Sequence, residues 1–313
     1  MRTFPLLLVL VTACHHKPAP IAPLAATADP NDPLRFMPPT SEVIVGVDLV
    51  QLRTSPLWAQ VAPRISGYGS RILEPFQHTC GWDPVATAST LTMGVQNLAL
   101  AQPDATLVVR GIDRERFLAC AKNASASGVP ISVDANTANV PGVLAAVFVE
   151  PTLAVIQIGP NSSPESVQRV IAAGAPLRAT PPQVQTSGAA WIVAQGDARI
   201  LTAAQNLAGK PKLLTGSLRV LGDLSLAGRV QFPAADAAEE FAKRVRATFA
   251  LTSGMMQRSS VTVTGNDALI ELVATYPEAS RIVDAAVPMP GPTPPPADTA
   301  PAESPPTRIP TTR

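Results

Sequence analysis

Residues 224–232 read LSLAGRVQF, and this stretch decides the fold. From Leu224 to Phe232 an apolar or small residue recurs at every second position. Alternate residues of a β-strand point to the same side, so the pattern predicts a strand with one apolar face. A Gly-Asp turn joins it to a strand expected at 218–221, and an amphipathic helix is expected at 235–252. This combination predicts an antiparallel sheet with one face buried under helices.

The same order of elements is expected twice along the chain. The first copy has strands expected at 42–49, 90–95, 105–111, 143–150 and 153–159, with helices at 55–62, 113–123 and 163–173. The second has strands expected at 190–196, 218–221, 224–232, 260–264 and 268–275, with helices at 198–208, 235–252 and from 277 onwards. We therefore predict an α+β fold of two tandem copies, residues 41–174 and 188–287. Each copy has the order β-α-β-β-α-β-β-α and is a mostly antiparallel sheet with helices packed on one face. The sequence leaves open whether the copies are separate domains or share one sheet.

Two local similarities support this internal repeat. Pro164-Glu165 precedes an Ala-Ala pair by eight residues, and Pro277-Glu278 precedes another Ala-Ala pair by the same eight. Proline suits the first turn of a helix and glutamate complements its dipole, so helix-start chemistry alone could produce part of this match. The first strands of the two copies also end alike, at Asp48 and Asp197. The first copy carries an inserted loop at 66–88.

Proline-rich segments flank the predicted folded part. The chain has 34 prolines, many of them in residues 14–40 and 288–313. Such segments bury too little apolar surface to offset chain entropy, so we expect an extended tether and a disordered tail. The tail could alternatively be an arm that reaches a partner or the peptidoglycan layer. A shorter segment with a Pro-Pro pair, 175–187, is the predicted linker between the copies.

The first fourteen residues predict export. Arg2 is followed by the apolar run Phe4–Val11, too short to span a bilayer, and by Val11-Thr12-Ala13-Cys14. This segment resembles a bacterial lipoprotein precursor, with a signal peptide at 1–13 and a lipobox that ends at Cys14. The resemblance implies cleavage before Cys14, acylation of its thiol and anchoring in a lipid bilayer of the cell envelope. His15, rather than aspartate, follows the cysteine, and by the same resemblance this favours the outer membrane.

Cys80 and Cys120 are the two cysteines that remain after Cys14. Two thiols in an oxidising compartment usually pair, so we predict a disulfide between Cys80 and Cys120. It would staple the inserted loop onto the helix at 113–123 and remove roughly 4 kcal/mol of unfolded-state entropy. No C-x-x-C spacing occurs, so thioredoxin-like redox chemistry is unsupported.

Residues that support catalysis are scarce. His15 and His16 lie in the tether, where two adjacent imidazoles without a scaffold make no metal site. His78, in the string QHTCGWDP, could act as a base beside a nucleophile, but we favour a loop fixed by the disulfide. Asp48 and Asp197 could pair as catalytic carboxylates, but turns into the following helices are the simpler interpretation. Neither H-E-x-x-H, G-x-S-x-G, Walker A nor G-x-G-x-x-G occurs, so we predict no metal, no cofactor and no enzymatic activity.

Charge and composition narrow the classes of partner. The sequence has 24 Lys and Arg residues, one of them Arg2 in the segment removed, and 23 Asp and Glu residues. A neutral chain without a basic cluster does not favour nucleic acid. Aromatic residues make up only 4% of the chain, so stacking surfaces for sugars or bases are scarce.

Residues 47–58 (VDLVQLRTSPLW) resemble the opening of uncharacterised envelope lipoproteins, and this resemblance implies no particular activity. We expect a non-catalytic, membrane-anchored envelope lipoprotein that acts as an interaction or scaffolding module for an unknown envelope protein. The alternative is a binding protein or carrier for a small apolar ligand or lipid held between the two copies; a second alternative is an uncharacterised hydrolase. A pocket of several hundred Å³ with apolar walls would favour the ligand-binding alternative, and a close-packed body would favour scaffolding.

Overall fold

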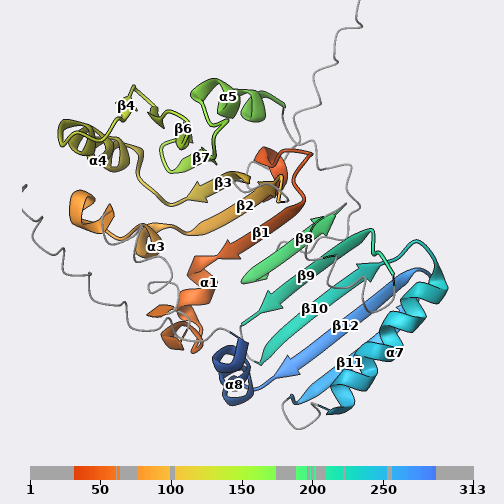
Figure 1. Ribbon diagram of the computed structural model, residues 1–313. Helices are drawn as coiled ribbons and strands as arrows, with labels where there is room; N and C mark the ends of the chain where they lie inside the picture. The colour runs from red at the N-terminus through yellow and green to blue at the C-terminus, as the bar shows by residue number, and fades with distance from the viewer. Residues whose placement is uncertain are drawn as a thin grey trace, which may run out of the picture. The chain divides into compact units, whose positions relative to one another are not determined.

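The computed structural model describes residues 32–60, 62–63, 76–98, 103–173, 188–195, 198, 201, 209–220, 223–251 and 256–286. Within these ranges twelve strands form one sheet, and the strand pairings are antiparallel throughout (Figure 1). The strands are β1 (Val43–Asp48), β2 (Thr90–Gln96), β3 (Asp104–Arg110), β4 (Ser132–Val133), β5 (Thr137–Val140), β6 (Leu144–Glu150), β7 (Leu153–Ile158), β8 (Ala190–Gln195), β9 (Leu213–Arg219), β10 (Leu224–Gln231), β11 (Arg258–Thr264) and β12 (Asp267–Ala274). Across the sheet they lie in the order β11-β12-β10-β9-β8-β1-β2-β3-β7-β6-β5-β4.

The predicted pair of tandem sheets is therefore wrong, because β1 and β8 pair directly and make the sheet continuous. Val43 lies opposite Ala194, and Val47 lies opposite Ala190. Each strand would otherwise be the unpaired edge of its own sheet, and pairing them satisfies both rows of backbone groups. From this central pair the strands run outward as β1-β2-β3-β7-β6-β5-β4 on one side and as β8-β9-β10-β12-β11 on the other.

Helices lie on both faces of the sheet, which corrects the prediction that they cover one face. The described helices are η1 (Pro33–Phe36, a 3-10 helix), α1 (Leu49–Thr54), α3 (Pro84–Thr87), α4 (Arg114–Ala126), α5 (Pro164–Ala173), α7 (Ala235–Leu251) and α8 (Tyr276–Ala286). The face here called the aliphatic face consists of Val43, Val45 and Val47 and the residues level with them on the other strands; α4 and α7 pack on it. Phe36 and Met37, at the end of η1 and just after it, pack on the opposite face together with helix α5.

The sequence of β6, LAAVFVE, explains why the first half of the sheet is covered on both sides. Its residues are apolar at successive positions rather than alternate ones. Val147 joins the buried cluster that includes Val167 of α5, whereas Phe148 packs against Phe117 of α4, with the ring centroids 5.5 Å apart. A strand that is apolar on both faces is stable only when both faces are covered.

Aspartates set the starts of three helices. The side chain of Asp48 accepts a hydrogen bond from the backbone N–H of Gln51 at 2.9 Å, and Asp113 caps α4 in the same way through Arg116 at 2.8 Å. Asp83 caps α3. These caps satisfy backbone donors that a helix leaves unpaired. The turn interpretation of Asp48 is confirmed, and its cap begins α1 at Leu49, a helix that was not expected. The helix expected at 55–62 overlaps a separate helical stretch, in which residues 58–60 and 62–63 are described.

Several other expectations differ from the structure or fall outside it. Strands β4 and β5 were not expected, and β9 begins at Leu213 rather than at 218. The predicted signal peptide, Cys14 and its lipobox, the linker 175–187 and the tail 288–313 lie outside the described residues, as do Asp197 and most of the helix expected at 198–208.

Candidate ligand-binding site

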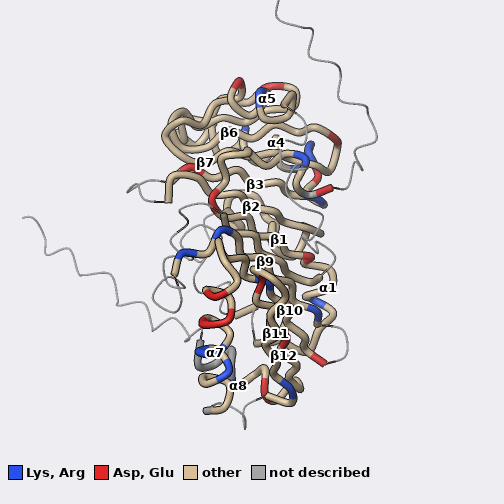
Figure 2. Tube along the Cα trace, turned by 90° about the vertical axis from the view of Figure 1, so that its right-hand side faces the viewer, with Lys and Arg blue, Asp and Glu red and all other residues tan. Residues whose placement is uncertain are grey.

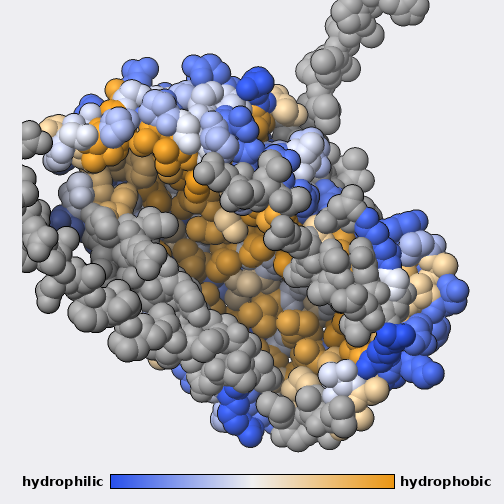
Figure 3. Space-filling view, viewed as in Figure 1, coloured by the Kyte–Doolittle hydropathy of each residue, from blue (hydrophilic) through white to orange (hydrophobic). Residues whose placement is uncertain are grey.

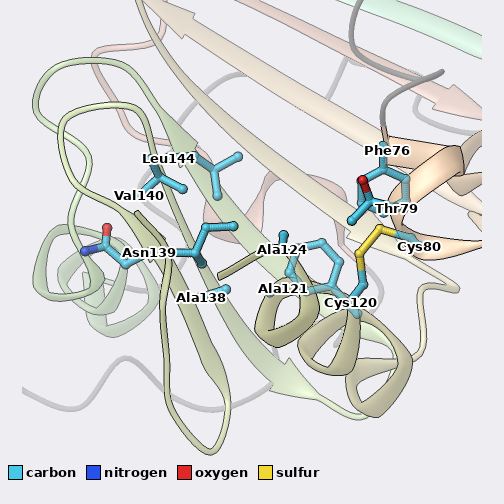
Figure 4. A pocket seen from close by; sticks show the side chains of 12 residues that line it. Phe76, Thr79, Cys80, Cys120, Ala121, Ala124, Ala138, Asn139, Val140 and Leu144 are labelled. Atoms are coloured by element: carbon cyan, nitrogen blue, oxygen red, sulfur yellow. A yellow bond between two sulfur atoms is a disulfide. The ribbon is translucent and has the colours of Figure 1, made fainter. Parts of the chain in front are cut away.

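An apolar pocket of about 320 Å³ lies between α4, the segment 76–80 and strands β5 and β6 (Figure 4). It sits on the aliphatic face within the first half of the chain, not between the two halves. The residues that line it are Phe76, Thr79, Cys80, Phe117, Cys120, Ala121, Ala124, Ile131, Ala138, Asn139, Val140 and Leu144.

Small residues on the inner side of α4 make room for the pocket. Cys120, Ala121 and Ala124 follow one another on the helix surface that looks toward the sheet, and Ala138 faces them from β5. Residues one turn apart on a helix share a face, so three small side chains in this register leave a gap that leucines would fill. Larger residues, Phe117 among them, form the surrounding walls.

The disulfide between Cys80 and Cys120 closes one side of the pocket. The structure joins these two cysteines, with their Cα atoms 5.0 Å apart, which confirms the predicted pairing. It holds the segment 76–80 against α4, so that Phe76 becomes part of the wall. The Phe76 ring also meets Trp82 edge to face, with centroids 5.0 Å apart, and Trp82 is buried. Residues 76–80, which belong to the predicted insertion, thus form one wall of the pocket.

The chemistry of the lining is almost entirely apolar. Thr79, an exposed residue, brings a side-chain hydroxyl to the lining. The side chain of Asn139 points away from the pocket in Figure 4, so this residue contributes mainly its backbone. Neither an acid nor a base lines the pocket among the described residues, and the two cysteines are bonded to each other. A charged group would be desolvated there without a partner, so the site suits an uncharged, apolar occupant.

The size of the pocket sets the size of its occupant. A cavity of roughly 150 Å³ lined by aliphatic and aromatic residues binds one benzene molecule. By that measure the pocket, at about 320 Å³, holds an apolar molecule of about twelve carbon atoms. One medium-length acyl chain has this size.

The residues weighed for catalysis do not gather in this pocket. His78 is exposed and does not line it, and Asp48 is engaged as a helix cap. His15, His16 and Asp197 lie outside the described residues. In the described ranges no three His, Cys, Asp or Glu side chains are grouped so that they could hold a metal ion.

Sequence reasoning missed the pocket because no motif marks it. Its only signal is the run of small residues Cys120, Ala121 and Ala124 on a helix that otherwise packs with larger residues such as Phe117 and Leu118. An apolar stripe of this kind is also typical of a filled core. Only the placement of β5, a strand that was not expected, shows that the space beneath α4 stays open.

Comparisons with known proteins extend only to the fold. No family model and no curated protein matches the chain. One solved structure, described as "Structure of crystal form I of TP0453", is similar over 82% of this chain and 98% of that chain, with a TM-score of 0.52 and 9% sequence identity. At this identity the likeness concerns the arrangement of the backbone alone. Across the described residues we find no helix with the length and apolar character needed to cross a membrane.

Proposed function

We propose that this protein is a lipid-anchored lipoprotein of the cell envelope whose folded part binds one small apolar ligand, such as an acyl chain. The observation that carries the proposal is the open apolar pocket of about 320 Å³ beneath α4. The anchor rests on the sequence, in which an apolar run ends in Val11-Thr12-Ala13-Cys14. Anchoring at the outer membrane would keep the pocket close to a source of acyl chains.

The pocket supports one of the two leading expectations from the sequence over the other. A scaffolding module needs a close-packed body and an interface, because packing gives its surface a fixed shape. A ligand-binding module needs a preformed concave site of roughly 300–1,000 Å³ with apolar walls. The pocket falls within that range, and it is walled by rigid elements: a disulfide, a helix and two strands. We therefore favour ligand binding.

Filling the pocket tests the proposal. Ala124 lines the pocket and is only half-buried, so Ala124→Phe directs a ring into it. A ring needs roughly 150 Å³, about half of the space, and displaces about six carbon atoms of the ligand. At about 0.8 kcal/mol for each methylene group, this loss weakens binding by well over 100-fold. The measurement is calorimetric titration of the full chain with dodecanol.

Ala119→Phe is the matched control, because Ala119 is exposed on the same helix and does not line the pocket. We expect one molecule of dodecanol to bind per chain in the wild type and in Ala119→Phe, and none in Ala124→Phe at the same concentrations. Ala124→Leu, which fills less of the space, gives intermediate weakening and remains informative if the phenylalanine prevents folding. Absence of dodecanol binding to the wild type, or equal affinity in all four proteins, would contradict the proposal.

A further inference from the structure

At the centre of the sheet, small polar side chains are buried and apolar side chains are partly exposed, which is the reverse of the usual arrangement. On the face opposite the aliphatic face, Thr92, Thr215 and Ser217 are buried, with at most 8% of their surface exposed. Their neighbours on the aliphatic face, Met93 and Leu218 for example, are only half-buried. In a sheet with one solvated face, the polar residues normally face water and the apolar residues face the core. Here the aliphatic side is the more open one.

The aliphatic face carries no charge over the width of the sheet. From β5 to β12, each residue on it is Ala, Val, Leu, Ile, Met, Phe or Gly, as the pairing registers place them. Charged residues lie mostly on helices and near strand ends, with both signs interspersed (Figure 2). Ile158 and Leu226, both on this face, keep 40% and 38% of their surface exposed. Ala198 and Leu201 bury Ala194 of β8 on this face, whereas most of its neighbours stay partly open. Open apolar surface of this extent marks an interaction site.

Two glycines lie on this face in the second half of the sheet, on β9 and β10. Gly216 of β9 and Gly228 of β10 lie directly opposite each other, so neither strand places a side chain there. A Cβ atom added at Gly228 would find its nearest neighbours 3.7 and 3.8 Å away, which is ordinary contact distance, whereas one added at Gly216 would lie 3.2 Å from the Ile192 side chain. Figure 3 shows, on the side of the sheet that carries α4 and α7, a recessed region lined with hydrophobic residues, here called the hollow. Glycine in the middle of a strand often marks a place where a ligand approaches the backbone.

The hollow and the pocket under α4 meet at neighbouring strands of the same face. Leu144 lines the pocket and lies directly opposite Ile158, the exposed residue at the near end of the hollow. From Ile158 on β7 to Gly228 on β10 there are six strand spacings, or about 29 Å. One acyl chain spans about half of a hydrocarbon core of roughly 30 Å. The open part of the face is therefore about two acyl chains long.

We propose that the aliphatic face, together with the pocket, binds a phospholipid with two acyl chains and leaves its head group in water. The inference rests on the proposed function, because one chain enters the pocket under α4 and the other lies along the hollow over Gly216 and Gly228. The absence of charge on the face fits acyl chains, and the combined length fits two of them. A single chain would leave most of the hollow exposed to water.

The test compares a lysine placed on the aliphatic face with a lysine placed on the opposite face of the sheet. Leu226→Lys puts an ammonium group into the hollow, whereas Ala227→Lys puts one on the opposite face of the same strand, level with Glu271 of β12. Gly228→Val fills the hollow without a charge and suits a strand better than glycine does. All proteins are the full chain with Cys14→Ser, so that no covalently attached lipid competes.

Each protein is incubated with vesicles of dioleoyl phosphatidylcholine, separated from them by centrifugation and weighed by native mass spectrometry. We expect one phospholipid per chain in the reference protein and in Ala227→Lys, and at least a tenfold smaller bound fraction in Leu226→Lys and Gly228→Val. Dodecanol binding in the pocket stays unchanged in Leu226→Lys. Ala124→Phe reduces the binding of both ligands.

The outcomes separate this inference from the proposed function. Dodecanol binding without phospholipid binding, or phospholipid binding that Leu226→Lys leaves intact, overturns the two-chain inference alone. Failure of both ligands to bind overturns both proposals. A mass that corresponds to a protein dimer, and that Leu226→Lys reduces to the mass of a monomer, would show that a second copy of the protein covers the face. That result would also overturn the inference.

Discussion

The junction of the two halves of the sheet can be tested through one glycine and one tryptophan. Gly46 of β1 lies directly opposite Trp191 of β8, and a Cβ atom at Gly46 would overlap the Trp191 ring. Trp191 is only 5% exposed, so its ring has little room to move away. Overpacking of this kind costs about 1–3 kcal/mol, and we expect Gly46→Ala to lower the free energy of unfolding by that amount.

The partner substitution removes the obstacle. Trp191→Ala alone costs about 3–5 kcal/mol, because it leaves a cavity. In that background Gly46→Ala has no ring to meet, and alanine suits a strand better than glycine by roughly 0.5–1 kcal/mol. The second substitution should therefore become neutral or stabilising, with a coupling energy of at least about 1 kcal/mol. Gly228→Ala, where a Cβ meets its neighbours only at ordinary contact distances, is the control and should not destabilise the protein.

Urea unfolding followed by far-ultraviolet circular dichroism gives the four free energies of the cycle. If the costs of Gly46→Ala and Trp191→Ala add within about 0.5 kcal/mol, the two residues do not touch. That result would refute the pairing of β1 with β8, and with it the single continuous sheet.

Two further predictions concern the disulfide and the last helix. Replacing both Cys80 and Cys120 with serine opens a loop with a sequence separation of 40 residues. Urea unfolding should then give a free energy of unfolding that is lower by about 4 kcal/mol. A loss below about 1 kcal/mol would contradict this reasoning. The backbone N–H of Thr275 donates to the carboxylate of Glu278 and holds the pKa of that group below its usual 4.5. A pKa lowered by folding stabilises the protein above about pH 4.5, and the stabilisation is lost as the pH falls through the folded pKa. The difference in urea midpoint between wild type and Glu278→Gln should therefore be full at pH 7 and shrink below pH 4.5; an equal difference at pH 3 and pH 7 would count against the cap.

Local sequence patterns predicted most of the individual elements, because each depends on neighbouring residues. The alternation from Leu224 onward gave β10, and Asp113 correctly marked the start of α4. The predicted helix at 235–252 matches α7 closely. These features follow from strand and helix periodicity and from capping, all of which act within a few residues.

The arrangement of the sheet could not be predicted in the same way. Whether β1 pairs with β8 depends on which strand edges remain free, and this is decided by contacts between residues about 150 positions apart, such as Val43 with Ala194. The sequence of β6 did show apolar residues on both of its faces, a sign that helices would cover both.

From the sequence, an apolar ligand-binding pocket could be predicted only as one alternative, and not at its actual position. Cys80 and Cys120 could be paired from the compartment and their number, and the open space beside them follows from three-dimensional packing around Ala124. The alternation in residues 224–232 predicted an apolar face and also its burial. The face exists, but Leu226 within it is 38% exposed, and this difference points to an occupant that the described residues do not supply.

The most direct test of ligand binding is a crystal structure of the protein soaked with bromododecanol, with the bromine located by anomalous scattering. The account predicts one strong peak between α4 and strands β5 and β6, within the space lined by Phe117, Ala124 and Leu144. A map without a peak in that space, or with the bromine bound only elsewhere on the molecule, would contradict it.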